Sequence, residues 1–172
     1  MTNTVEWGLM LGEADVLEFY ERTSGEVYRY ASRLVGGDRA RAQDLVQETY
    51  LTLVRQVRGG RTEPVDIGWA ITTCRSRFLD DLRRVQTIER TRRRLFERHH
   101  HAVDSEPTSA TEALSRLNDT QRAVLVLRFV DEMSVPEVAA AIGRSVHATE
   151  SLLMRAKQSL RTQYETTREV ER

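Results

Sequence analysis

The sequence predicts an all-α fold made of two small helical domains joined by a linker. Only three prolines and nine glycines interrupt 172 residues that are rich in helix formers. Several long segments repeat apolar residues at the spacing of a helix with one buried face. Between two groups of such segments, residues from about His99 to Ser109 show no apolar period and contain Pro107, so they are predicted to be the linker.

The first domain begins with a helix whose apolar residues run from Val16 to Leu34 and which ends at Gly36 and Gly37. Asp38 is placed to cap the second helix. One face of that helix is polar and carries Asp44, Gln47, Glu48 and Arg55. The other face is a broad apolar stripe formed by Leu45, Val46, Thr49, Tyr50, Leu53, Val54 and Val57.

Residues 58–68 are predicted to form a loop before the third helix, because they contain three glycines and a proline. This helix is expected from about Asp66 to Val85. Its apolar residues are predicted to be buried, namely Trp69, Ile71, Phe78 and Leu82. Its arginines are predicted to stay available on the outside, namely Arg75, Arg77, Arg83 and Arg84.

The second domain is expected from about Thr111, with core stripes formed by Leu114, Leu117, Val124, Leu125, Leu127 and Phe129. At residues 134–137 a helix start is indicated by Ser134 as N-cap, Pro136 in the first turn and Glu137 as the capping-box partner. This helix ends at Gly143, and Ser145 can cap the last helix. Two helices joined by a short turn containing glycine are typical of a helix-turn-helix.

Projection of the last helix at about 100° per residue separates a buried face from an outer face. The inward residues are Val146, Thr149, Leu153, Ala156 and Leu160, and the outward residues are His147, Ala148, Ser151, Arg155 and Gln158. Glu150 and Leu152 fall at the sides. Ser, Gln and Arg side chains can bond phosphates or base edges, so the outer face is a candidate DNA-reading surface. A helix pair that merely packs would have the same pattern.

The formal net charge is zero, with 26 basic and 26 acidic residues. However, arginines outnumber acidic residues between Arg75 and Arg98. Because salt screens distant charges, a locally basic segment can bind phosphate even in a neutral protein. The alternative is a solvated arginine-rich helix face.

The sequence gives no sign of an enzyme, a cofactor or a metal site. No phosphate-binding glycine loop or nucleophile motif occurs. His99, His100 and His101 are adjacent rather than three or four apart, and Cys74 is single, so a metal site is not expected. The sequence contains no apolar run of about 18 residues, so no membrane-spanning helix is expected. The start does not resemble a secretory signal, and a cytoplasmic location is expected.

Three segments resemble conserved regions of the ECF (extracytoplasmic function) sigma factors of bacterial RNA polymerase, in the family order. "VYRYASRLVGGDRARAQDLVQETYLTLVR" resembles regions 2.1–2.2, and "WAITTCRSRFLDDLRR" is similar to region 2.4. "LNDTQRAVLVLRFVDEMSVPEVAAAIGRSVHATESLLMRAKQSLR" resembles region 4. The resemblance implies a region 2 domain over 10–98, a linker over 99–110 and a region 4 domain over 111–166.

The resemblance also implies partners and roles. Core RNA polymerase would bind through its β′ clamp helices to Asp44, Gln47 and Glu48. The second domain would pack on the β flap, and an anti-sigma factor is a further possible partner. The promoter −10 element would be contacted by Arg61, Trp69, Arg75, Ser76, Arg77, Arg83 and Arg84. The −35 element would be read by Arg144, Ser145, His147, Ser151 and Arg155.

The chain departs from the family pattern at several positions. Arg41 and Gln43 stand where the family usually has carboxylates, and Ser76 stands where it often has asparagine. Glu150 and Leu152 replace frequent basic residues of the −35 helix. Two other functions therefore stay open: a sigma mimic that occupies an anti-sigma partner without driving transcription, and a stand-alone helix-turn-helix repressor, which would need dimer symmetry.

Overall fold

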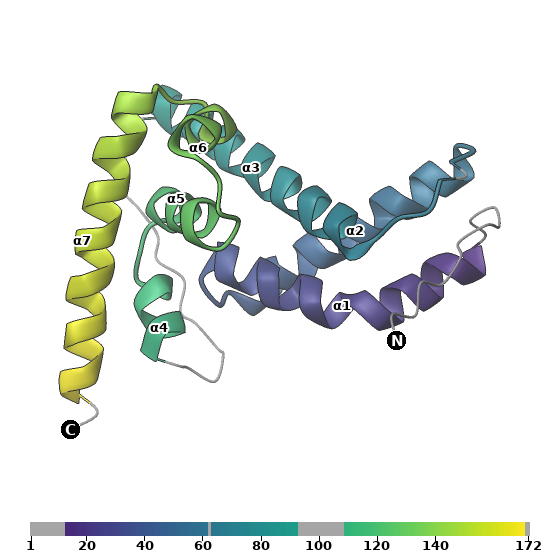
Figure 1. The fold of residues 1–172 in the computed structure, drawn as a ribbon, viewed down its shortest axis with the longest axis horizontal. Coiled ribbons are helices and arrows are strands. Elements are labelled where there is room, and N and C mark those ends of the chain that lie inside the picture. Colours follow the sequence, from purple (N-terminus) through teal and green to yellow (C-terminus); the bar gives the residue numbers. More distant parts are fainter. Residues whose placement is uncertain (1–12, 62, 93–108, 171–172) are drawn as a thin grey trace.

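The computed structural model describes residues 13–61, 63–92 and 109–170, and this part of the chain contains helices and no strands (Figure 1). The first three helices are α1 (Glu13–Val35), α2 (Arg39–Arg58) and α3 (Ile67–Arg92). The remaining helices are α4 (Ser109–Ser115), α5 (Asp119–Phe129), α6 (Val135–Ile142) and α7 (Val146–Val170). The all-α prediction is confirmed. Most of the predicted linker at 99–110, including His99, His100 and His101, lies outside the described residues, and Ser109 already begins α4.

The first domain consists of α1, α2 and α3, which all pack against one another. The turn between α1 and α2 needs two glycines, because Gly36 and Gly37 have φ values of 68° and 82°. Asp38 caps α2 as predicted, since its side chain accepts a hydrogen bond from the backbone N–H of Arg41. The fully buried side chains of this domain include Val27, Leu34, Leu53 and Phe78.

The second domain is organised around α7, which packs against α4, α5 and α6 and runs along one side of the molecule (Figure 1). The start of α6 has the predicted capping box, in which Ser134 and Glu137 satisfy each other's backbone N–H groups. Gly143 ends α6 in the left-handed conformation, with a φ of 66°. The helix-turn-helix expected from these local signals is therefore present as α6 and α7.

Three burial predictions in the second domain are wrong. Phe129 is 54% exposed and Val146 is 43% exposed, whereas Leu152 is only 7% exposed. The two exposed residues are the last residue of α5 and the first of α7. The ring of Phe129 meets the ammonium group of Lys157 on α7, at 4.8 Å, and stays partly in solvent. Leu152 and Leu153 are both buried because α7 is in contact with three helices, which widens its buried face.

The third helix also differs from the prediction. It continues to Arg92 instead of ending near Val85. Trp69 and Ile71 are half-buried rather than buried, whereas Phe78 and Leu82 are buried as expected. Both half-buried residues lie in the first turns of α3, close to the loop that precedes the helix.

A buried arginine joins the two domains. Arg122 of α5 is 4% exposed, and its guanidinium donates hydrogen bonds to the backbone oxygens of Leu114, Ser115 and Leu117, at 2.9, 3.2 and 2.6 Å. It also lies 3.4 Å from the backbone oxygen of Leu34, near the end of α1, and 3.0 Å from Asp119. Burial lowers the pKa of Arg122, and Asp119 partly offsets that effect. The five groups supply the electronegative partners that a buried cation needs.

Glu132, in the turn between α5 and α6, has a φ of 55°, a conformation that costs a residue with a side chain about 1–2 kcal/mol. We predict that Glu132→Gly raises the free energy of unfolding by about 0.5–1 kcal/mol and the melting temperature by about 1–4 °C, since glycine adopts this φ freely but has more entropy to lose. Thermal unfolding followed by circular dichroism measures the change.

Glu150→Gly is the matched control, because Glu150 is exposed inside α7. There glycine should lower the stability by about 1 kcal/mol. Equal destabilisation by both substitutions would show that the turn at Glu132 is not strained.

Candidate functional site

The polar face of α2 is exposed as predicted. Asp44, Gln47 and Glu48 are all exposed, and the opposite face of the helix buries Leu45 and Leu53. The carboxylate of Glu48 has a weak ion pair, at 3.7 Å, with Arg55 on the same helix. Because these polar groups do not support the core, they are free to contact another molecule.

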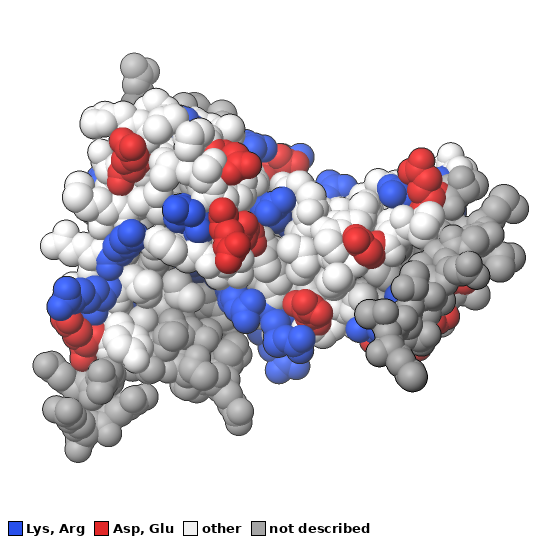
Figure 2. Space-filling view, in the orientation of Figure 1, with Lys and Arg blue, Asp and Glu red and all other residues white. Residues whose placement is uncertain are grey.

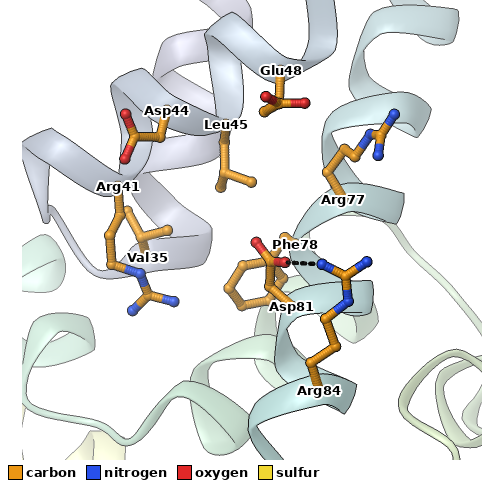
Figure 3. A pocket seen from close by; sticks show the side chains of 9 residues that line it. All are labelled: Val35, Arg41, Asp44, Leu45, Glu48, Arg77, Phe78, Asp81 and Arg84. Carbon is orange, nitrogen blue, oxygen red and sulfur yellow. Dashed lines mark ion pairs between the residues drawn. The ribbon is translucent and has the colours of Figure 1, made fainter. Parts of the chain in front are cut away.

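A groove of about 360 Å³ lies between α2 and α3 (Figure 3). Asp44 and Glu48 come from α2, while Arg77 and Arg84 come from α3, together with Asp81, which pairs with Arg84 at 3.8 Å. The remaining residues that line it are Val35, Arg41, Leu45 and Phe78. The groove thus brings two of the predicted polymerase-binding residues next to two of the predicted −10 residues, with apolar groups between them.

The prediction that four arginines of α3 stay available on the outside is confirmed for Arg83 and Arg84, which are exposed, and wrong for Arg75 and Arg77, which are half-buried. Arg75 is half-buried and donates to a carboxylate oxygen of Asp131, in the second domain, at 3.2 Å. Arg83 donates to the backbone oxygen of Ala141, at the end of α6. Arg77 donates to the hydroxyl of Thr52 on α2 at 2.9 Å. The helix therefore directs Arg77 and Arg84 toward the groove and Arg75 and Arg83 toward the second domain.

The other predicted −10 residues lie near the start of α3 and along its surface. The guanidinium of Arg61 lies 5.8 Å from the ring centroid of Trp69, and it donates to the side chain of Gln56 at 2.6 Å. The Trp69 ring is half-buried and remains partly accessible for stacking. Ser76 is exposed, although its hydroxyl donates to Thr72 of its own helix at 2.9 Å.

The helix-turn-helix exposes most of its predicted DNA-reading residues. Arg144, His147 and Arg155 are exposed, and Ser151 is half-buried. Ser145 acts as the cap of α7, because its hydroxyl accepts a hydrogen bond from the backbone N–H of Ala148 at 3.2 Å. This surface is only weakly basic.

Glu150 and Leu152 of α7, which stand where the family often has basic residues, lie in different environments. Glu150 is exposed, and its carboxylate lies 3.9 Å from the imidazole of His147. Leu152 is buried, so it lies in the core and not at the side of the reading face. Glu150 alone therefore changes the charge of the outer surface.

Basic and acidic side chains alternate on the face shown in Figure 2, where neither sign forms a continuous block. Among the described residues, no cluster of three metal-ligating side chains occurs. No helix in that same part of the chain has the length and hydropathy needed to span a membrane. The mixed charges on the face in Figure 2 favour recognition by specific contacts over attraction by a strong electrostatic field.

The contacts between the domains were missed by sequence reasoning. Tyr30 of α1 donates a hydrogen bond to Asp131 at 2.8 Å, and the side chain of Asp131 is 7% exposed. Neither residue was a candidate site residue in the sequence, and the two are 101 positions apart. Only a signal that pairs distant positions could have identified them.

Comparisons with known proteins identify both domains. Residues 19–88 match the model of "Sigma-70 region 2", and residues 109–160 match that of "Sigma-70, region 4". The ECF RNA polymerase sigma factor BldN of Streptomyces coelicolor is 32% identical in an alignment of 162 residues that covers 87% of this chain and 60% of that protein. The ECF RNA polymerase sigma factor SigE of Mycolicibacterium smegmatis is 27% identical over 157 residues, covering 84% of this chain and 59% of the relative.

A solved structure supports the fold. The sigma factor RpoE of Bartonella quintana, in complex with the anti-sigma factor NepR, aligns with a TM-score of 0.52 at 18% identity, over 88% of this chain and 97% of RpoE. The chain spans about 60% of the length of the two curated relatives. With region 2 and region 4 both present in the family order, the chain belongs to the ECF RNA polymerase sigma factors.

Proposed function

We propose that the chain is an alternative sigma factor that binds core RNA polymerase and directs transcription initiation to a specific set of promoters. The observation that carries this proposal is the presence of both conserved regions on one chain, each with an exposed polar surface. The sigma factor supplies specificity and the polymerase supplies the chemistry, so the chain itself acts without a catalytic residue or cofactor, in the cytoplasm.

The first domain binds the β′ clamp helices through Asp44, Gln47 and Glu48. The exposure of these side chains and their place beside a groove with apolar residues support this role. The same domain contacts the −10 element. Trp69 offers a ring for stacking on an unpaired base, and Arg77 and Arg84 offer guanidinium groups for phosphates beside the groove.

The second domain reads the −35 element through α7 and packs on the β flap of the polymerase. His147, Ser151 and Arg155 follow one another at intervals of about one helical turn, and His147 and Arg155 are exposed. Residues spaced in this way can contact the same stretch of a major groove. Arg144 and Ser145, in the turn before α7, are placed for phosphate contacts.

The runner-up function is a sigma mimic that occupies an anti-sigma factor. One observation favours it: Arg41 and Gln43 provide no carboxylate beside Asp44, and Arg41 is paired with Asp119 of the second domain at 3.0 Å. Run-off transcription with core polymerase and fragmented genomic DNA separates the two functions. Promoter-specific transcripts that depend on the added chain support the sigma factor, and their absence in the presence of active core enzyme supports the mimic.

We predict that the double variant Asp44→Ala with Glu48→Ala binds core polymerase at least about tenfold more weakly, because it removes two exposed charges from the docking face. Its stability should change by under about 0.5 kcal/mol for each substitution, since neither side chain supports the core. Titration of a labelled chain with core enzyme measures the affinity.

The matched control is Glu112→Ala with Glu165→Ala, which removes the same charge from α4 and α7 of the other domain. Equal affinities for the wild type and the Asp44/Glu48 variant would remove the basis for this docking face. Equal weakening by both double variants would instead indicate a general charge effect.

We further predict that Arg155→Ala weakens binding to the −35 element by about 1–3 kcal/mol if the guanidinium reads a base. A phosphate contact would instead weaken binding to all duplexes alike and reduce the salt slope by about 0.9. Glu150→Lys should strengthen binding to cognate and scrambled duplexes together, because it replaces an exposed negative charge by a positive one. Binding curves on both duplexes at two salt concentrations distinguish these results. If neither substitution changed any curve, α7 would not be the reading helix.

A further inference from the structure

The exposed ring of Phe129 has a charged partner. Phe129 is the last residue of α5, and 54% of its surface is exposed. The ammonium group of Lys157 on α7 lies over this ring, 4.8 Å from the ring centroid. An ammonium group at this distance is attracted by the negative charge on the face of the ring. In Figure 1, α5 lies beside α7, so the contact joins the end of one helix to the side of the other.

Lys157 is the only lysine of the chain, and its ammonium group keeps its hydrogen-bond donors. Within the described part of the chain it forms no ion pair with a carboxylate, and the ring of Phe129 is its partner. Because the ring is not an oxygen acceptor, the N–H groups of Lys157 stay available for an acceptor on another molecule. Arg155 differs in this respect, since its Nε donates to the backbone oxygen of Ser151 at 3.3 Å.

A second cation lies at the same ring. The guanidinium of Arg128 is 5.8 Å from the ring centroid of Phe129, and it donates to the backbone oxygen of Met133 at 3.1 Å. This hydrogen bond ties Arg128 to the turn that follows α5. Arg128 therefore adds positive potential at the ring, while Lys157 is the cation that can reach another molecule.

Lys157 lies on one flank of the outer face of α7. At about 100° per residue, it falls about 80° to one side of His147, and Arg155 falls about 80° to the other side. A helix in the major groove turns its outer face to the base edges and its flanks to the phosphates of the two strands. Lys157 and Arg155 are thus placed for opposite walls of one groove. Glu150, two turns before Lys157, is exposed on the same flank and lowers the positive potential there.

We propose that Phe129 is a positioning residue for DNA binding: its ring holds the ammonium group of Lys157 at the flank of α7, where Lys157 contacts a backbone phosphate of the −35 element. A lysine side chain loses conformational entropy when a phosphate fixes it. Because the ring already restrains Lys157 in the free protein, less entropy is lost on binding. This role rests on the proposed function, since α7 must enter the groove, and it adds a residue outside α7 to DNA recognition.

The contact sets affinity and leaves base preference unchanged, because a phosphate contact carries no sequence information. Phe129→Leu keeps an apolar side chain and removes the ring, so binding to cognate and scrambled −35 sequences should weaken alike, by about two- to fivefold. Lys157→Gln removes the charge itself. It should weaken binding further and reduce the salt slope by about 0.9.

The experiment is a double-mutant cycle on the full chain bound to core polymerase. The wild type, Phe129→Leu, Lys157→Gln and the double variant are titrated at two salt concentrations against a promoter fragment found by run-off transcription, and against the same fragment with a scrambled −35 element. The cycle isolates the interaction between the two side chains from any separate effect of each one. In the Lys157→Gln background, Phe129→Leu should have no further effect.

Two further variants complete the design. Phe129→Tyr keeps an aromatic ring under the ammonium group, so it should bind DNA like the wild type. Val130→Ala is the matched control, because it shortens the next apolar side chain, which is 47% exposed, and leaves the ring in place. Thermal unfolding of each variant establishes that it is folded at the temperature of the titration.

The expected pattern is weaker binding for Phe129→Leu only where Lys157 is present, with wild-type binding for Phe129→Tyr and Val130→Ala. An equal loss from Phe129→Leu in both backgrounds would overturn the proposal, because the ring would then act without Lys157. Equal weakening by Val130→Ala, or unchanged binding by Phe129→Leu, would overturn it as well. Failure of the proposed function would show differently: the wild type would give no promoter-specific transcript, and this role would fall with it.

Discussion

The ends of two helices meet at one cation. The last carbonyls of α4 and a carbonyl near the end of α1 all face the guanidinium of Arg122, which lies at the N-terminal part of α5 beside Asp119. Each helix end carries partial negative charge that would be costly to bury without a donor. Arg122 supplies donors to both, and so it fixes α4 against α5 and holds the end of α1 on the second domain. Removing it would leave several buried carbonyls without a partner, a loss that water cannot easily replace.

The interface built around this cation determines which side chains of α3 are accessible. A helix presents residues that are three or four apart on one side, so Arg77, Asp81 and Arg84 line the groove with α2, whereas Arg75 and Arg83 lie toward α5 and α6. The same helix thus serves two surfaces at once. The two surfaces are not independent, because Arg41 lines the groove and also pairs with Asp119 of the second domain at 3.0 Å.

Features decided by nearby residues were predictable from the sequence. The caps at Asp38 and Ser134 and the turn at Gly143 depend on contacts within four residues, and all three occur as expected. Burial at helix ends was less predictable, because the spacing of Phe129 among the apolar residues does not show that its ring meets Lys157 of α7 and not another apolar side chain. The positions of Arg75 and Arg83 relative to the second domain were not predictable, since they result from contacts between residues more than fifty positions apart. The spacing of apolar residues within one helix gives no information about such a pair. The roles of the exposed residues remain predictions.

The groove between α2 and α3 places carboxylates and guanidinium groups within one screening length of each other. Asp44 and Glu48 repel a nucleic-acid backbone that approaches Arg77 and Arg84, as long as the carboxylates stay in water. A ligand that pairs these two carboxylates with positive charges of its own would remove that repulsion. Two ligands that share a groove in this way bind with a coupling free energy, and the coupling is reciprocal: each strengthens the other by the same factor.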